Sequence, residues 1–163
     1  MPARDEVDRI VEAWIRERPD LDFSPLHVLS RVGRLSRHVD LAKRAAFSAS
    51  ELESWEFDVL SALRRVGAPY QLSPKALLQQ TLVSSGTMTN RIDRLVDLGL
   101  VERHTDPHDG RGILVTMTET GQQRVDSAIS NLVEAEEGLL SALSATDRGR
   151  LASLLRKLSL DFD

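Results

Sequence analysis

Polar side chains with the chemistry to read DNA recur on one side of the segment 85–97. On a helix that turns about 100° per residue, Thr87, Asn90 and Arg94 share one side, and apolar residues occupy the other. Asn can pair with adenine and Arg with guanine in the major groove, while hydroxyl groups bond phosphates or base edges. The segment is therefore predicted to be a recognition helix, although an ordinary surface helix would also be polar on its exposed side. The side chains expected to contact DNA from it are Ser85, Thr87, Asn90, Arg91 and Arg94.

A further candidate DNA contact lies in the loop between two β-like runs, Leu100–His104 and Ile113–Thr118. The loop is rich in turn-forming residues, so the two runs are predicted to form a β-hairpin. Arg111 lies at its tip, between Gly110 and Gly112. An Arg on a narrow projecting ribbon suits the negative potential of an A·T-rich minor groove. The alternative is a surface turn that carries an Arg by chance.

Two aspartates in the same loop, Asp106 and Asp109, would repel phosphate if they faced it. We expect them to turn inward, because Asp side chains commonly cap the N–H groups of their own turn. Pairing with Arg111 or Arg103 is the other arrangement that would hold the tip of the loop rigid.

Helical periodicity predicts the elements that must position these side chains. Ser24-Pro25 and Ser73-Pro74 are typical helix starts, and Ser50–Glu53 has the pattern of a capping box. A tight connection, Leu82-Val83-Ser84, leads into the recognition helix and gives the outline of a helix-turn-helix. The predicted helices span 5–18, 24–47, the capping box to Gly67, 75–80, 85–97, 118–143 and 144–160. Their inward stripes include Leu52, Trp55, Val59, Leu63 and Val66 in the third and Met88, Ile92, Leu95 and Val96 in the fifth.

Composition narrows the classes of function. The chain has 163 residues, a formal charge of −4 and no cysteine, so disulfides, thiolate zinc sites and thiol redox switches are excluded. A globally basic surface is absent, and any DNA contact must come from a local patch. Charges recur throughout the N-terminal segment, and no apolar stretch is long enough to span a membrane. We therefore expect a soluble, cytoplasmic protein.

Motifs for catalysis and for cofactors are missing from the sequence. It contains no G-x-S-x-G, no Walker loop, no G-x-G-x-x-G and no HExxH, which argues against an enzyme. His104 and His108 are four residues apart, but nothing completes a metal set with them, so neither a metal nor a cofactor is predicted. A winged-helix module that binds proteins instead of DNA is the alternative class; it would favour exposed apolar anchors where this chain has polar residues.

The run from Leu98 to Arg103, the segment Asp106–Arg111 and the segment Leu114–Gly121 together resemble the winged helix-turn-helix of the MarR family. The similarity spans roughly residues 26–160, and its wing motif is Asp-x-Arg, with Gly110 where many relatives carry a second Arg. The resemblance implies a two-fold dimer that binds a palindromic operator in double-stranded DNA. It also implies repression that is relieved by a small ligand.

The additional first helix resembles the urate-responsive branch of that family. This resemblance implies a ligand set of Trp14, Asp58, Arg91 and Arg103. The residues themselves allow it: Asp58 is expected at the edge of the core, where a carboxylate needs a cationic partner, and an anion could replace it on Arg91 or Arg103. The plainer alternatives are that Trp14 belongs to the core, that Asp58 forms a structural ion pair and that Arg91 only touches phosphate. Urate is the expected anion, and a tricarboxylate such as citrate or aconitate is the alternative.

The expected architecture is mainly α with a small β-hairpin wing. The whole chain is expected to form one structural unit, in which three segments have different roles. Residues 1–48 would supply N-terminal helices for dimerisation and the ligand side, 49–118 the DNA-binding lobe, and 119–163 the C-terminal dimerisation helices. The first, second and last two helices carry more apolar surface than one lobe can cover, so a homodimer is predicted. The cluster Arg31, Arg34 and Arg37 is expected on a solvated or dimer surface, away from DNA.

Overall fold

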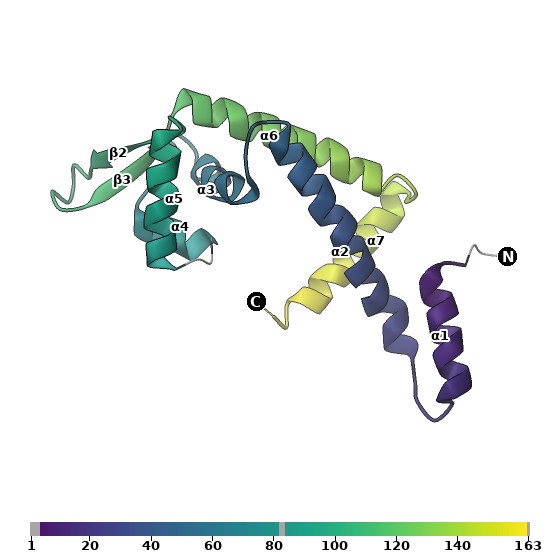
Figure 1. The fold of residues 1–163 in the computed structure, drawn as a ribbon. Helices are drawn as coiled ribbons and strands as arrows, with labels where there is room; N and C mark the ends of the chain where they lie inside the picture. The colour runs from purple at the N-terminus through teal and green to yellow at the C-terminus, as the bar shows by residue number, and fades with distance from the viewer. Residues whose placement is uncertain (1–3, 82–83, 163) are drawn as a thin grey trace. The chain divides into compact units, whose positions relative to one another are not determined.

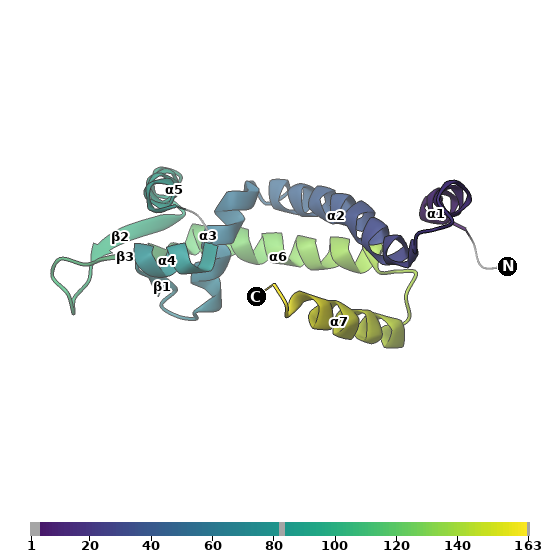
Figure 2. The same ribbon diagram turned by 90° about the horizontal axis from the view of Figure 1, so that it is seen from below.

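The computed structural model describes residues 4–81 and 84–162, and the chain divides into two compact units, residues 1–42 and 43–163. Figures 1 and 2 trace the order of the elements. The helices are α1 (Glu6–Glu17), α2 (Ser24–Ser48), α3 (Ser54–Arg65), α4 (Pro74–Thr81), α5 (Ser85–Asp97), α6 (Glu119–Leu139) and α7 (Ala145–Ser159). The strands are β1 (Gln71–Leu72), β2 (Val101–Thr105) and β3 (Ile113–Met117). The predicted winged helix-turn-helix architecture is confirmed, while Leu82 and Val83 of the predicted turn lie outside the described residues.

In the first unit, α1 is attached to α2 by ion pairs and by a small apolar contact. Val7 and Val11 of α1 are buried. Arg31 of α2 donates to Asp5 at 2.8 and 2.9 Å and to Asp8 at 2.7 Å. These hydrogen bonds from Arg31 hold the pKa of both carboxyl groups below the usual value of 3.8. Part of the basic cluster expected on a solvated or dimer surface therefore binds the acidic start of α1.

The second unit contains a three-stranded antiparallel sheet in the order β1-β3-β2. The hairpin pairs Val101 with Met117 and Thr105 with Ile113, and it projects from the helices as the predicted wing. The strand β1 was not predicted, because two residues carry no periodicity. The buried core beneath the sheet is formed chiefly by Val59, Leu60, Leu63, Leu77, Met88, Ile92, Leu95, Leu100, Val101, Val115, Val125 and Ala128.

A glycine and a threonine join the recognition helix to the wing and to α6. Gly99 has a φ of +70°, so it ends α5 in the left-handed region that glycine favours. Thr118 donates from its hydroxyl to the Gly99 carbonyl at 2.8 Å and accepts from the Gly121 N–H at 3.1 Å. The start of α6 is thereby tied directly to the end of α5.

The predicted start of the third helix is wrong. The helix α3 begins at Ser54 with Glu53 as its N-cap, three residues later than a capping box over Ser50–Glu53 would require. The Glu53 N–H donates to the carboxylate of Glu56 at 2.8 Å. The carboxylate that bonds the N-cap N–H therefore belongs to Glu56, whereas the predicted capping box would have used Glu53.

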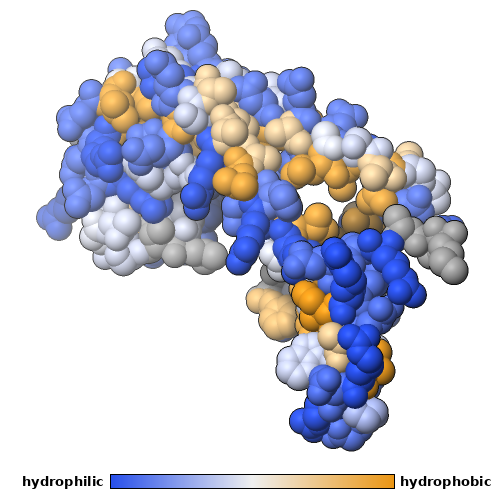
Figure 3. Space-filling model, turned by 45° about the vertical axis from the view of Figure 1, so that its right-hand side comes forward, coloured by the Kyte–Doolittle hydropathy of each residue, from blue (hydrophilic) through white to orange (hydrophobic). Residues whose placement is uncertain are grey.

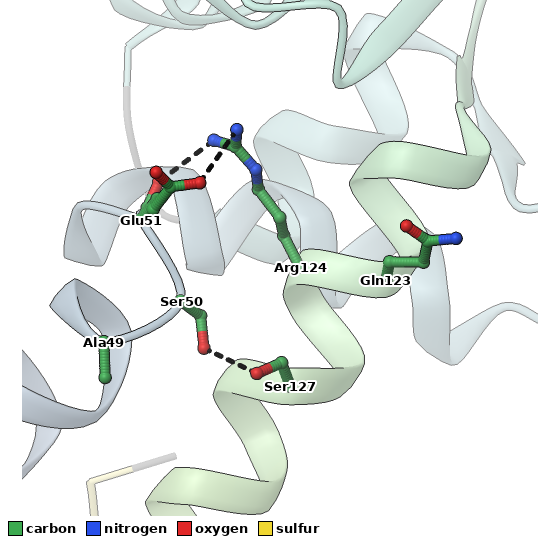
Figure 4. A pocket seen from close by; sticks show the side chains of 6 residues that line it. All are labelled: Ala49, Ser50, Glu51, Gln123, Arg124 and Ser127. Carbon is green, nitrogen blue, oxygen red and sulfur yellow. Dashed lines mark hydrogen bonds and ion pairs between the residues drawn. The ribbon is translucent and has the colours of Figure 1, made fainter.

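Ser50 and Glu51, which the prediction placed at the start of this helix, instead contact α6 and hold the segment between α2 and α3 against it (Figure 4). The Ser50 hydroxyl is buried and donates to the hydroxyl of Ser127 at 3.0 Å, while the Asn131 amide donates to Ser50 at 3.1 Å. Arg124 bonds the Glu51 carbonyl at 3.2 Å and pairs with its carboxylate at 3.2 Å. Glu51 has a φ of +54°, which a helical residue cannot have, so the predicted helix could not run through this position.

The last two helices also differ in detail from the prediction. The helix α6 ends at Leu139, four residues before the predicted Leu143, and α7 has no buried residue. Hydrophobic side chains reach the surface along the helices, as Figure 3 shows for one face. Those exposed on α2, α6 and α7 include Val28, Leu29, Val32, Leu35, Leu41, Ile129, Val133, Leu151, Leu154, Leu155 and Leu158. None of the described helices is both long enough and apolar enough to cross a membrane.

Candidate nucleic-acid interface and ligand residues

The helix α5 separates its polar and apolar sides largely as predicted. It begins after Ser84, whose hydroxyl accepts from the Thr87 N–H at 3.4 Å and bonds the Thr87 hydroxyl at 2.8 Å. Met88, Ile92 and Leu95 are buried, whereas Val96, expected to pack inward, is exposed. The polar side comprises Ser85, Thr87, Asn90 and Arg94, which are exposed, and Arg91, which is half-buried. These five side chains are therefore available on one helix for a partner.

Two of these side chains lie over an aromatic ring whose spacing in the sequence predicts a core position. Arg91 and Arg94 lie over the ring of Trp55, with guanidinium carbons 5.5 and 4.9 Å from its centroid. The ring, the two arginines and the side chains of Thr87 and Asn90 line a cavity of about 380 Å³. The contact was missed because Trp55 continues the spacing of the apolar stripe of α3, and nothing in that spacing indicates a cationic neighbour.

The wing loop is held by its own aspartates, as predicted. The Asp106 carboxylate accepts from the His108 N–H at 2.8 Å, and the Asp109 carboxylate accepts from the Arg111 N–H at 3.2 Å. The Asp106 N–H donates to the Gly112 carbonyl at 2.9 Å and closes the loop. Arg111 is exposed, so its guanidinium is presented at the end of a hydrogen-bonded turn.

The structure corrects the expected pairing of Asp58. Asp58 is exposed on α3 and takes part in none of the ion pairs between described residues. Arg103 on β2 instead pairs with Asp93 of α5 at 2.6 Å. The physical reason is proximity along the chain: α5 leads through a single tight turn into β2, so a carboxylate on the helix meets an Arg on the strand. The contact links the recognition helix directly to the wing.

Trp14 lies on α1, in the first unit, and its ring stacks on Phe23 with centroids 6.0 Å apart. Half of its surface is exposed, so it is not a core residue of that unit. His104 lies 3.3 Å from the carboxylate of Glu102, on the wing. Within residues 4–81 and 84–162, no three side chains form a group that could hold a metal ion.

A helix-turn-helix followed by a projecting β-hairpin, with an exposed polar recognition helix, defines a winged helix-turn-helix protein. Residues 50–112 match the model of the MarR family. The HTH-type transcriptional regulator PecS of Dickeya dadantii is 35% identical over 153 residues, which cover 94% of this chain and 92% of PecS. This chain belongs to the MarR family of DNA-binding transcriptional regulators, whose members are not enzymes.

Two further similarities agree with this assignment. The HTH-type transcriptional repressor NicR of Pseudomonas putida is 32% identical over 142 residues, with 85% of this chain and 88% of NicR covered. The structure of BpsR of Bordetella bronchiseptica, a protein whose DNA binding is regulated by 6-hydroxynicotinic acid, is also similar. It is 29% identical, covers 79% of this chain and 98% of BpsR, and gives a TM-score of 0.59. DNA readout is thereby favoured over the alternative of a protein-binding module.

Proposed function

We propose that this chain is a repressor that binds a palindromic operator as a homodimer and is released by a small planar anion. The observation that carries the proposal is the polar side of α5, exposed beside a projecting wing in a member of a DNA-binding family. In this proposal, α5 of each copy enters the major groove, and the proposed contacts are Ser85, Thr87, Asn90, Arg91 and Arg94. Arg111 of the wing reaches the adjacent minor groove.

The DNA contacts are tested by footprinting and titration with the DNA upstream of the gene. Two protected half-sites about one helical turn apart are expected from a two-fold dimer. Arg94→Ala should weaken operator binding about tenfold, because a bidentate Arg–guanine contact contributes about 1–3 kcal/mol. Arg9→Ala, which removes the same charge from an exposed position on α1, is the matched control. Equal affinity for the wild type and Arg94→Ala would contradict the assignment of α5 as the reading helix.

Dimerisation is supported by the apolar side chains exposed on α2, α6 and α7. Val28 and Leu35 of α2 and Leu154 of α7 each leave more than half of their surface exposed in the single chain. Burying apolar surface contributes roughly 25 cal/mol per Å², so a second copy that covers these helices would be held firmly. The mass in solution at micromolar concentration, from light scattering, tests this, and a monomer would contradict it.

The proposed ligand residues are Trp14, Asp58, Arg91 and Arg103, and urate is the first candidate. The similarity to BpsR supports an aromatic ligand. The guanidinium groups of Arg91 and Arg103 support a ligand that carries a negative charge. A tricarboxylate such as citrate or aconitate would use the same charges without the ring. Since Arg103 pairs with Asp93, an anion that binds Arg103 has to compete with that carboxylate.

A thermal-shift screen of purines, hydroxylated pyridine carboxylates and tricarboxylates, followed by operator titrations, separates these ligands. Asp58→Asn and Trp14→Phe should keep the operator affinity and reduce the sensitivity to the best compound. Asp40→Asn, which changes another exposed carboxylate, on α2, is the control. Equal ligand sensitivity in Asp58→Asn and the wild type would mean that the ligand binds elsewhere.

A further inference from the structure

One tryptophan organises the basic groups of the proposed reading face. Trp55 lies in the first turn of α3 and is half-buried, with part of its ring facing α5. The guanidinium carbons of Arg91 and Arg94 lie 5.5 and 4.9 Å from the ring centroid, within the range of a cation–π contact. A single ring therefore contacts both arginines of the recognition helix.

The ring is in turn hydrogen-bonded to a carboxylate. The indole N–H donates to Glu53 at 2.5 Å, and the other oxygen of Glu53 lies 3.9 Å from Nη2 of Arg94. The backbone N–H of Glu53 is bound in turn by Glu56, which is buried. Because an indole has only one donor, this hydrogen bond favours an orientation of the ring in which its N–H points to Glu53. A connected path thus leads from the buried start of α3 to the side chains on α5.

We propose that Trp55 is a positioning residue for DNA recognition, and that Glu53 is its anchor. The inference rests on the proposed function, in which α5 reads the operator. A guanidinium stacked on a ring uses its face for the contact and leaves its N–H groups free at the edge, where a guanine or a phosphate can accept them. Holding two long side chains in this pose reduces the ordering cost of binding.

Glu53 adds selectivity to this arrangement. Its carboxylate lies 3.9 Å from Arg94 and repels an approaching phosphate, so it weakens the phosphate contacts on which non-specific binding depends. A guanine accepts two hydrogen bonds from Arg94 through its neutral O6 and N7 atoms, so this carboxylate opposes it less. Glu53→Gln keeps an acceptor for the indole N–H and removes the charge. It should therefore tighten binding to non-specific DNA more than binding to the operator.

The test compares variants of Trp55 by the ratio of operator affinity to non-specific affinity. Trp55→Leu should lower this ratio about fivefold, or roughly 1 kcal/mol, since each exposed cation–π contact is worth a few-fold. Trp55→Phe retains an aromatic face but loses the hydrogen bond to Glu53, so it should lower the ratio clearly less than Trp55→Leu does. Thermal midpoints control for folding; should Trp55→Leu fail to fold, Trp55→Met supplies the non-aromatic comparison.

A double-mutant cycle with Arg94→Ala separates positioning from a merely structural role. Once Arg94 is absent, Trp55→Leu should cost markedly less of the specificity ratio than it does alone. Fully additive effects would overturn the inference, and so would an equal loss in Trp55→Phe and Trp55→Leu. An unchanged ratio in Trp55→Leu, with a clear loss in Arg94→Ala, would also overturn it while leaving the proposed reading helix intact. If Arg94→Ala itself has no effect, the proposed function fails first.

Discussion

Replacing Gly121 by alanine should destabilise the protein, because α6 passes directly over the backbone that joins the recognition helix to the wing. A Cβ atom built on Gly121 would lie 2.2 Å from the Leu100 carbonyl oxygen and 3.0 Å from the Met117 side chain. The Leu100 carbonyl cannot move freely, since it accepts the Thr118 N–H at 3.0 Å. The added methyl group therefore has to displace the helix or break that hydrogen bond.

The magnitude follows from two opposing effects. Overpacking of a fixed core contact costs about 1–3 kcal/mol, and a rigid backbone partner puts Gly121→Ala near the upper end. Alanine is the better helix former by at most about 1 kcal/mol. A net destabilisation of about 2 kcal/mol is expected, which lowers the thermal midpoint of a chain of this length by roughly 4–8 °C.

Thermal unfolding at one fixed protein concentration measures the effect, since a dimer gains stability with concentration. Gly138→Ala is the matched control, because Gly138 lies in the same helix and a Cβ there meets nothing within 4 Å. It should leave the thermal midpoint unchanged or raise it slightly, because Gly138 is the next-to-last residue of α6 and gains only part of the roughly 0.5–1 kcal/mol that alanine contributes in a helix interior. If Gly121→Ala proved as stable as Gly138→Ala, the close approach of α6 to the Leu100 carbonyl would be refuted.

Two further predictions concern DNA and one concerns acid. Asn90→Ala should lose about 1–3 kcal/mol of discrimination at one base pair in each half-site, measured by competition with single-base operator variants; an unchanged preference would contradict base readout. Arg111→Ala should weaken binding to all sequences and lower the salt slope by about one, so an unchanged slope would count against a phosphate or minor-groove contact. Because Arg31 lowers the pKa of Asp5 and Asp8 from 3.8, their contribution to stability is complete above pH 3.8 and is lost as the pH falls below it. Arg31→Met should remove that part of the pH dependence of the thermal midpoint, and an identical acid limb would refute it.

Much of the fold could be predicted because its boundaries are local. Ser84 caps α5, Thr118 caps α6 and Gly99 ends the recognition helix with a positive φ, and each residue type has a strong preference for that position. The hairpin could be predicted for the same reason, from turn-forming residues between two β-like runs. Such signals act within a few residues and need no knowledge of distant packing.

The errors have non-local causes. The residues Ser50–Glu53 have the local pattern of a capping box, but they do not form one. Ser50 is bonded instead to Ser127 and Asn131 of α6, seventy-seven and eighty-one residues further along the chain. The strand β1 exists because the Met117 N–H donates to the Tyr70 carbonyl at 3.0 Å and β3 pairs beside it. Neither partner can be identified from the spacing of residues around these positions.

The candidate site divides in the same way. The exposed side of α5 follows from helical periodicity, whereas the partners of its charged residues depend on which elements lie beside it. Asp93 meets Arg103 because the turn at Gly99 folds β2 back along α5, and this leaves Asp58 without the pairing expected for it. Under the proposed function, an anion that binds Arg103 would break its half-exposed ion pair with Asp93, and operator binding would weaken to the extent that this pair holds the recognition helix and the wing together. By linkage, the operator must weaken the affinity for that anion by the same factor.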